Sequence, residues 1–180
     1  YETKSSYSAT VTASDGTNSS TQDITVTVTN VNDNSPVFTS GAAFSVVENQ
    51  TGIGTITATD DDGDTLSFSL SGTDASSMSI NSSSGVLVFD SAPDYETKTS
   101  YSATVTASDG TNSTTQNITI TITDIDDTAP VFTSSASFSA AENQTSIGTV
   151  TATDVDTDNA SITFSISGSE LAITSGGVLT

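Results

Sequence analysis

The 180-residue chain contains no cysteine, no histidine, no tryptophan and no arginine. Without cysteine, it can form neither disulfide bridges nor thiolate metal sites. Without histidine, its serines lack the base that activates a serine nucleophile, and zinc lacks its usual nitrogen ligand. The longest apolar runs are only a few residues long, so the sequence offers no membrane span. We therefore expect no catalytic site and no contact between this segment and a membrane.

Positive charge is also scarce. Only Lys4 and Lys98 oppose 22 acidic residues, which gives a formal net charge of −20 at pH 7. Nucleic acids and anionic membranes attract clustered cations, so both are poor partners for this chain. Uncompensated charge of this size destabilises a compact chain. We therefore expect a cation to neutralise part of it.

A long internal repeat organises what is present. Thirty of the forty residues from Tyr1 to Ser40 recur unchanged between Tyr95 and Ser134, with a constant offset of 94 positions. Such a period indicates a tandem array. The expected units are residues 1–34, the C-terminal half of a repeat; 35–128, a complete repeat; and 129–180, the N-terminal part of the next. We expect the polypeptide to continue covalently at both ends; the alternative is that separate subunits complete one another head to tail.

Alternation of apolar and hydroxyl residues dominates each unit. The segments 7–13, 24–29 and 118–123 all follow this two-residue period, which is typical of half-buried antiparallel strands. Turn signals such as Asp15-Gly16 separate the strands, and no segment shows helical periodicity. About seven strands per repeat predict an all-β fold of tandem Greek-key β-sandwiches. The short linkers 30–36 and 124–130 place these sandwiches end to end.

Most acidic residues fall at strand ends or in the linkers. In Asp-x-Asp and Asp-x-Glu the two carboxylates project to the same side of an extended strand, so both can reach one point. Crowded carboxylates repel one another or take up protons unless a cation lies between them. Calcium fits best, because it accepts six to eight oxygen ligands in a flexible geometry. Magnesium demands a stricter octahedron, and zinc favours ligands that are absent here.

Several short motifs occur in a fixed order along the chain. They are Glu-Asn, Asp-Tyr-Glu, Ala-x-Asp-Gly, the linker pattern ending in Pro-x-Phe, and Ala-Thr-Asp-x-Asp. Together they resemble the cadherin repeat, of a bacterial type, over essentially the whole chain. The resemblance implies calcium sites between consecutive domains, with about three ions per linker.

Carried over residue by residue, the resemblance assigns metal ligands to both linkers. The first linker would use Glu2, Val31, Asn32, Asp33, Asn34, Asp60, Asp62 and Asp109. The second would use Glu48, Asp94, Glu96, Ile125, Asp126, Asp127, Thr128, Asp154, Asp156 and Asn159, with backbone carbonyls supplied by Val31, Asn34, Ile125, Thr128 and Asn159.

The chain departs from the family pattern at a few positions. The first linker begins with Asn30 where the family usually has Asp, and the second has Asp126 and Thr128 where the family has Asn. The segment after Asp62 is two residues shorter than in the third unit, so Asp64 is a candidate substitute for a carbonyl ligand. The chain also lacks the tryptophan on which strand-exchange adhesion in this family depends.

Two other kinds of site also use clustered acidic residues. The run Asp60–Asp64 superficially matches an EF-hand, but its glycine is misplaced and strands flank it. A paired-carboxylate glycosidase would need a site built once, whereas these acids recur in every repeat.

The sequence therefore predicts a non-enzymatic, calcium-rigidified rod of an extracellular or cell-surface adhesin or filament. Its partners would be neighbouring repeats of the same array, or identical subunits in a filament. The alternative function is an adhesive module that makes homophilic or glycan contacts through its sandwich faces.

Overall fold

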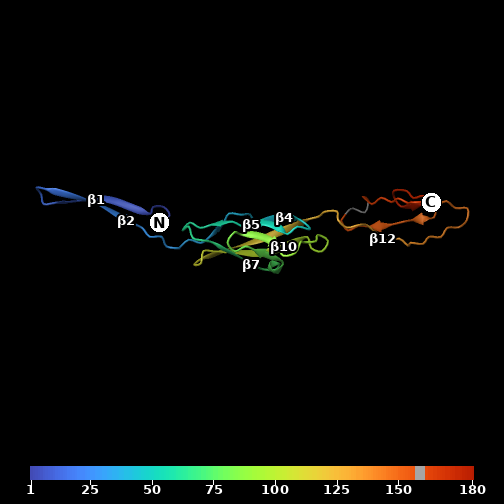
Figure 1. Ribbon diagram of the computed structural model, residues 1–180, viewed down its shortest axis with the longest axis horizontal. Coiled ribbons are helices and arrows are strands. Elements are labelled where there is room, and N and C mark those ends of the chain that lie inside the picture. The colour runs from blue at the N-terminus through green and yellow to red at the C-terminus, as the bar shows by residue number, and fades with distance from the viewer. Residues whose placement is uncertain (157–160) are drawn as a thin grey trace.

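The computed structural model describes residues 1–156 and 161–180. Figure 1 shows three units in a row along the longest axis of the molecule: an N-terminal hairpin, a central sandwich and a C-terminal unit. The described residues form strands and one short 3-10 helix, η1 (Ala75–Ser77). Within them, no helix has the length and apolar character needed to cross a membrane. The predicted all-β fold is confirmed.

The strands follow the chain in this order. They are β1 (Ser6–Ser14), β2 (Ser19–Thr27), β3 (Val37–Phe38), β4 (Ala43–Val47), β5 (Gly52–Thr55), β6 (Ala58–Thr59), β7 (Ser67–Ser71), β8 (Met78–Ile80), β9 (Val86–Phe89), β10 (Ser100–Ser108), β11 (Ser113–Thr123), β12 (Val131–Phe132), β13 (Gly148–Thr149), β14 (Ala152–Thr153) and β15 (Val178–Leu179).

The central unit is a sandwich of two sheets. One sheet has four strands in the order β4-β11-β10-β7, and the other has three in the order β5-β9-β8. Strand β4 pairs parallel to β11, whereas the other pairings in these sheets are antiparallel. A short β3–β6 pair lies beside them in the same unit. These seven main strands match the number expected for a complete repeat.

Alternation of side chains builds the core of this sandwich. In β11 the residues Ile118, Ile120 and Ile122 are buried, and the threonines between them are exposed. Strand β10 buries Ala103, Val105 and Ala107 in the same way. Because successive residues of a strand face opposite sides, this two-residue pattern gives each strand one apolar face.

Side chains from both sheets meet in that core. Ile56 and Leu87 are at most 1% exposed and belong to one cluster with the apolar residues of β10 and β11. The rings of Phe89 and Tyr101 pack edge to face with their centroids 4.8 Å apart, an arrangement that aromatic pairs prefer. A single hydrophobic core therefore holds the central unit together.

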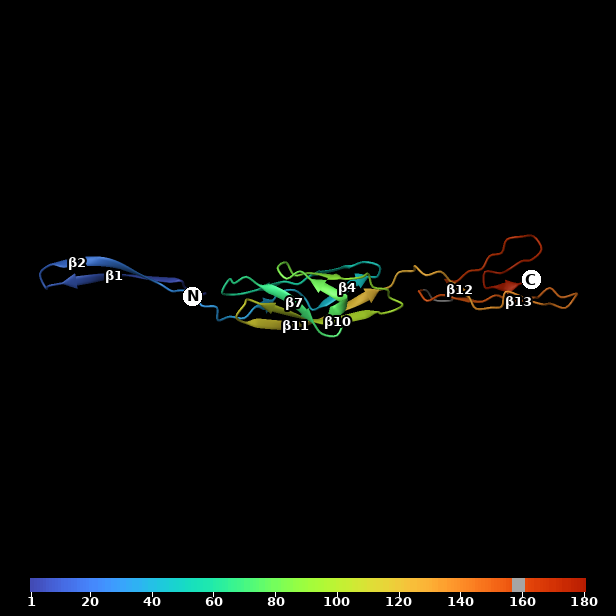
Figure 2. The same ribbon diagram turned by 60° about the horizontal axis from the view of Figure 1, so that its bottom comes forward.

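The flanking units differ sharply from the central one. The hairpin β1–β2 has the same register as its copy β10–β11, but every residue of both strands is exposed. In the described residues of the C-terminal unit, strand pairing is limited to the short pairs β12–β14 and β13–β15 and one bridge between Ile173 and Leu179. Figure 2 shows that the hairpin extends away from the sandwich and that the C-terminal unit lies at the opposite end.

Gly85 closes a tight turn in the central unit. Its φ angle is +70°, and a Cβ atom at this position would lie 2.1 Å from the carbonyl oxygen of Ile56. The amide of Ile56 in turn donates a hydrogen bond of 2.9 Å to the Gly85 carbonyl. The close approach of two backbone segments therefore requires glycine here.

We expect Gly85→Ala to destabilise the central unit by at least about 2 kcal/mol, because a side chain would strain the backbone and displace Ile56. The matched control is Gly41→Ala, since a Cβ atom there meets no atom within 4 Å and φ is not positive. The control should change stability by less than about 0.5 kcal/mol. Urea denaturation monitored by circular dichroism measures the free energy of unfolding of both variants. Equal stability of the two variants would show that position 85 does not require glycine.

Candidate metal-binding sites at the junctions between units

Two acidic junctions connect the three units. We call the linker 30–36 and the unit ends beside it junction 1, and the linker 124–130 and its flanking unit ends junction 2. Each junction contains one deeply buried carboxylate: Asp62 is 8% exposed at junction 1 and Glu48 is 1% exposed at junction 2. Burial of a charged group requires compensating hydrogen bonds or a counter-ion.

At junction 1, Asp62 ties the linker to the central unit. Its Oδ2 atom accepts hydrogen bonds from the backbone amides of Asp33 at 3.0 Å and Asn34 at 2.8 Å. The Asn30 side chain donates to the Asp62 carbonyl at 2.8 Å. The pKa of Asp62 lies below its usual value, and the hydrogen bond from the Asn34 amide is the largest cause of this shift. Partial desolvation acts in the opposite direction but does not reverse the shift. Asp62 is therefore held as a charged carboxylate.

Two other carboxylates at junction 1 are only partly satisfied. Carboxylate oxygens of Asp60, Asp62 and Asp64 all lie within 4.8 Å of one another, and Glu2 and Asp33 form a second such group with Asp62. The Oδ2 atoms of Asp60 and Asp64 are buried and accept no hydrogen bond. Partial desolvation and repulsion from neighbouring carboxylates raise the pKa of Asp64. These oxygens lack the proton donors that buried anions require.

A turn after β10 completes junction 1. Asp109 accepts hydrogen bonds from the amides of Thr111 at 2.7 Å and Asn112 at 2.6 Å. The Asn112 side chain then donates to Asn32 Oδ1 and to the Asn34 carbonyl, both at 2.9 Å. Asn112 thereby orients two linker oxygens that the family resemblance assigns as metal ligands.

At junction 2, Glu48 has the role of a buried anchor. Its Oε1 atom accepts a hydrogen bond from the Ile125 amide at 2.9 Å, and its Oε2 atom accepts one from the Tyr95 amide at 2.8 Å. One carboxylate thus joins the end of β4 to the linker and to the segment before β10. The next residue, Asn49, has φ 63° and turns the chain sharply after this anchor.

Asp156 links the linker to the C-terminal unit as Asp62 does at junction 1. Its Oδ2 atom accepts hydrogen bonds from the amides of Asp127, at 2.9 Å, and Thr128. These bonds outweigh partial desolvation and lower the pKa of Asp156. Its Oδ1 atom is buried and accepts no hydrogen bond. The two junctions therefore share one arrangement: an amide-bound oxygen and, beside it, unsatisfied carboxylate oxygens.

Charge crowding is strongest around Glu96. Carboxylate oxygens of Glu48, Glu96 and Asp124 lie within 4.8 Å of one another, and Glu96 forms a second group with Asp127 and Asp156. Partial desolvation, and then the proximity of Asp156 and Glu48, raise the pKa of Glu96 to about 7. The pKa of Asp124 is raised by the same kinds of cause. Junction 2 would thus take up a proton unless a cation is present.

No cationic side chain of the described residues neutralises these groups. The ion pairs in residues 1–156 and 161–180 are Lys98 with Asp74, which belongs to none of the carboxylate groups, and the N-terminal amine with Glu2. The donor set is made entirely of oxygen atoms, several of them buried and unsatisfied. Such a set of oxygen ligands fits a hard divalent cation. The arrangement offers no nucleophile–base pair and suits ion binding rather than catalysis.

The structure brings together many of the ligands expected from the sequence. Glu2, Asp33, Asp60 and Asp62 lie in the carboxylate groups of junction 1, and Glu48, Glu96, Asp127 and Asp156 lie in those of junction 2. Three expected ligands lie outside these groups but are bonded at the junctions: Asp154 accepts from the Asp156 amide, Asn32 accepts from Asn112, and Asp109 caps its turn.

Other expected ligands are placed less directly. Asp94 accepts bonds from Thr97, and neither Asp94 nor Asp126 belongs to a carboxylate group within the described chain. The carbonyl of Asn34 accepts a hydrogen bond from the Asn112 side chain. Like Asn34, the residues Val31, Ile125 and Thr128 lie in the linkers. Asn159 lies outside the described residues. The assignment of all these ligands stays a prediction.

Two residues that the structure places at the junctions were not expected there from the sequence: Asp124 belongs to a carboxylate group, and Asn112 bonds the linker of junction 1. Asp64, the candidate substitute ligand, lies in a carboxylate group with Asp60 and Asp62. Asp64 stood out as an acid after Asp-x-Asp, and Asp124 as the first acid of the linker. Asn112 gave no such signal, because its role depends on a contact with residues about eighty positions away.

Comparison with known proteins agrees with this architecture. Residues 42–123 match the model of the cadherin domain. Mouse protocadherin Fat 4 is 38% identical over 162 residues, which cover 82% of this chain and 3% of that protein. Mouse cadherin EGF LAG seven-pass G-type receptor 1 is 35% identical over 159 residues, covering 81% of this chain and 5% of that protein. The chain thus spans only a small part of the relatives that it matches.

Solved structures show the same arrangement of units. A cis-dimer structure of protocadherin gammaB7 domains EC3-6 aligns with a TM-score of 0.79 and 28% identity, covering 99% of this chain and 51% of that one. Mouse cadherin-23 EC22-24 aligns with a TM-score of 0.73 and 28% identity, covering all of this chain and 65% of that one. The chain belongs to the cadherin family, as a cadherin-like repeat protein. Cadherins are adhesion proteins rather than enzymes, so the expectation of a non-enzymatic chain is confirmed.

Junction 2 should make stability depend on pH when a chelator removes divalent cations. The pKa of Glu96 is raised from 4.5 to about 7 by folding, so protonated Glu96 favours the folded state. Below about pH 4.5 this favourable contribution is fully present, and it is lost as the pH rises through about 7. We expect the melting temperature in chelator to fall over this range, and to fall less in Glu96→Gln.

The control for this prediction is Glu170→Gln, which removes an exposed carboxylate from outside both junctions. It should leave the pH dependence of the melting temperature as in the unchanged chain. An unaltered pH dependence in Glu96→Gln, measured by differential scanning calorimetry, would show that Glu96 is not the titrating group.

Proposed function

We propose that this chain is a segment of an extracellular adhesive rod whose consecutive cadherin-like units are clamped together by calcium. The observation that carries the proposal is that carboxylates gather at both junctions, where buried oxygens of Asp60, Asp64 and Asp156 accept no hydrogen bond. The units would be residues 1–34, 35–128 and 129–180, with about three ions at each complete junction.

The carboxylate groups draw on both sides of each linker. At junction 1, Glu2 comes from the first unit, Asp33 from the linker and Asp62 from the central unit. At junction 2, Glu96 comes from the central unit, Asp127 from the linker and Asp156 from the C-terminal unit. A cation shared by such a group would connect two units and the linker, so binding it would restrict rotation between them.

Electrostatics favours the same proposal. Charges a few ångströms apart repel by a few kcal/mol at the effective dielectric constant of a protein surface. Calcium supplies a double positive charge with flexible oxygen coordination, and the unsatisfied oxygens of Asp60, Asp64 and Asp156 suit that demand. The amides bind one oxygen of Asp156 and leave the other, Oδ1, without a hydrogen bond, whereas Asp62 Oδ1 accepts a hydrogen bond from the Asn34 side chain at 3.1 Å. Without a cation, the same repulsion would push the units apart.

The proposed location follows from affinity. Extracellular calcium modules typically dissociate at about 10⁻⁴ to 10⁻³ M, so a site of this class is filled outside a cell and empty inside it. A strongly acidic chain with no cysteine is compatible with such a setting. The relatives also bear the names of cadherins and protocadherins, which supports an adhesion-related role at the cell surface. Neighbouring repeats would be the main partners of each unit.

Removing one central carboxylate should weaken calcium binding at one junction only. We expect Asp62→Asn to weaken binding at junction 1, and Asp156→Asn at junction 2, each by at least about tenfold. The matched control is Asp23→Asn, which makes the same charge change on β2, where Asp23 bonds only to Thr10 in the described contacts. Calcium titration calorimetry measures the affinities and the number of ions.

Two outcomes of this titration would contradict the proposal. One is the absence of calcium binding to the unchanged chain at millimolar concentration. The other is an equal loss of affinity in Asp23→Asn and Asp62→Asn, because a general effect of net charge would then explain the result.

A further inference from the structure

The two linkers enter the units that follow them through the same local fold. Strand β3 follows the first linker and pairs with β6, and β12 follows the second linker and pairs with β14 in the same register. Asp62 follows β6 at the same spacing at which Asp156 follows β14. The two linkers therefore meet these aspartates in equivalent positions.

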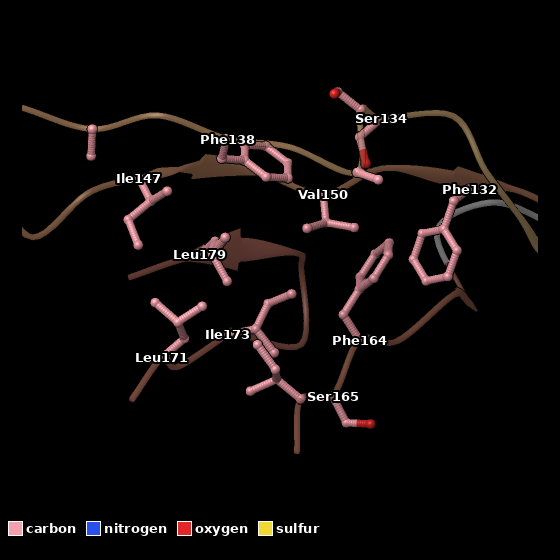
Figure 3. A pocket seen from close by; sticks show the side chains of 14 residues that line it. Phe132, Ser134, Phe138, Ile147, Val150, Phe164, Ser165, Leu171, Ile173 and Leu179 are labelled. Carbon is pink, nitrogen blue, oxygen red and sulfur yellow. The ribbon is translucent and has the colours of Figure 1, made fainter. Parts of the chain in front are cut away.

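The interiors of the two following units agree with this correspondence. A Cβ atom on Gly177 would lie 2.3 Å from the carbonyl oxygen of Val150 and 3.2 Å from the Phe164 ring. Figure 3 shows Val150 and Phe164 among the apolar side chains around one pocket of the C-terminal unit. In the central unit, a Cβ atom on Gly85 would lie 2.1 Å from the carbonyl oxygen of Ile56. The two linkers thus meet the same local fold and differ in their own residues.

The first linker has side-chain amides that bind Asp62. The Nδ2 atom of Asn34 donates a hydrogen bond to Asp62 Oδ1 at 3.1 Å, and that of Asn30 donates to the Asp62 carbonyl at 2.8 Å. Together with the two backbone amides on Oδ2, these bonds give both carboxylate oxygens of Asp62 a partner in the linker. Hydrogen bonds of this kind stabilise a buried carboxylate as an anion. Groups of the chain itself therefore bind this linker to the central unit.

A third side-chain amide reaches the first linker from the central unit. Asn112, in the turn between β10 and β11, donates to Asn32 Oδ1 and to the Asn34 carbonyl, both at 2.9 Å. An amide is neutral, so these bonds attach the linker at a second point without adding to the repulsion between carboxylates.

The second linker lacks two of the corresponding donors. Asp124 and Thr128 stand at the positions of Asn30 and Asn34, with the repeat offset of 94. A carboxylate has no N–H group, so Asp124 cannot make the hydrogen bond that Asn30 makes. Asp124 also adds a negative charge where Asn30 is neutral.

One carboxylate oxygen at junction 2 is unsatisfied as a result. Two backbone amides bind Asp156 Oδ2, as their copies bind Asp62 Oδ2. The Thr128 hydroxyl, however, donates to Asp127 Oδ1 at 3.3 Å. Asp156 Oδ1 is buried and accepts no hydrogen bond within the described chain, whereas Asp62 Oδ1 is bound by Asn34. A buried anionic oxygen without a donor is costly unless a cation lies beside it.

We propose that Asn30, Asn34 and Asn112 are positioning residues that hold the first linker on the central unit in the absence of a cation, whereas the second linker is released from the C-terminal unit when its cation is lost. The second half of this inference rests on the proposed calcium clamp, and the first half does not. The two junctions then respond unequally to a fall in calcium. At junction 1 the linker stays bound to the unit that follows it, and at junction 2 the linker itself becomes free.

Hydrogen exchange of single backbone amides, followed by NMR in chelator, tests the first half. The amides of Asp33 and Asn34 report on the linker, because both donate to Asp62 Oδ2. We expect both to exchange at least about tenfold more slowly than in an unstructured chain. The double variant Asn30→Asp with Asn34→Thr gives the first linker the two residues of the second. The Asp33 amide should then exchange at least about tenfold faster, because a hydrogen bond to a charged group contributes about that factor.

The matched control is Asn117→Asp, which makes the same charge change on the exposed face of β11. Asn117 Oδ1 accepts a hydrogen bond from the Thr104 hydroxyl at 2.8 Å, and aspartate keeps that acceptor. This control should leave exchange of the Asp33 amide as in the unchanged chain. The Ile122 amide, which donates to the Thr99 carbonyl at 2.9 Å, reports whether the central unit stays folded in each variant.

The reciprocal variant tests the second half. Asp124→Asn with Thr128→Asn gives the second linker the donors of the first, so the Asp127 amide should exchange at least about tenfold more slowly in chelator. In the unchanged chain, millimolar calcium should slow exchange of the Asp127 amide more than that of the Asp33 amide.

Four results would overturn this inference. Unprotected Asp33 and Asn34 amides in chelator, or equal acceleration by the double variant and by Asn117→Asp, would contradict the first half. A reciprocal variant with unchanged exchange at Asp127, or an equal effect of calcium at Asp33 and Asp127, would contradict the second. Because the chelator measurements contain no free calcium, failure of the calcium clamp in calorimetry leaves the result for the first linker as it stands.

Discussion

The repulsion among carboxylates that the fold gathers at its junctions is the constraint on which the rest of the structure depends. The central sandwich is held together by its own apolar core, and short acidic linkers connect it to the units on either side. At both junctions an aspartate binds two linker amides, Asp62 in one and Asp156 in the other. These bonds fix the linker close to other acids, so stability between units depends on what neutralises them.

Apolar residues and acidic residues therefore lie in different parts of this chain, the apolar ones in the core and most of the acidic ones at the junctions. The alternating residues of β10 and β11 supply the apolar face of the central unit. Most of the acids lie at strand ends or in the linkers, outside the apolar cluster, although Glu48 and Asp62 are buried there. Such a division allows a repeat to be copied almost unchanged, because each copy adds one core and one junction.

Much of this architecture could be predicted from the sequence, and the reasons are local. The two-residue alternation of Ile118, Ile120 and Ile122 defines a strand with one buried face, and the structure confirms it. The pairing of Asp60 with Asp62 also follows from spacing along the chain. The contribution of Asn112 could not be predicted, because it depends on a turn meeting a distant linker. Strands β1 and β10 have the same two-residue period, yet β1 is exposed and one face of β10 is buried. The period alone cannot predict this difference, because burial depends on which partner strands are present.

The most direct test of the calcium clamp is the distribution of distances across junction 2. Spin labels at Thr119→Cys and Thr153→Cys, both exposed positions in a chain without native cysteine, report the relative orientation of the central and C-terminal units. We expect a broad distribution in chelator that narrows to a single sharp peak at millimolar calcium. A distribution of the same width in both conditions would contradict the calcium clamp.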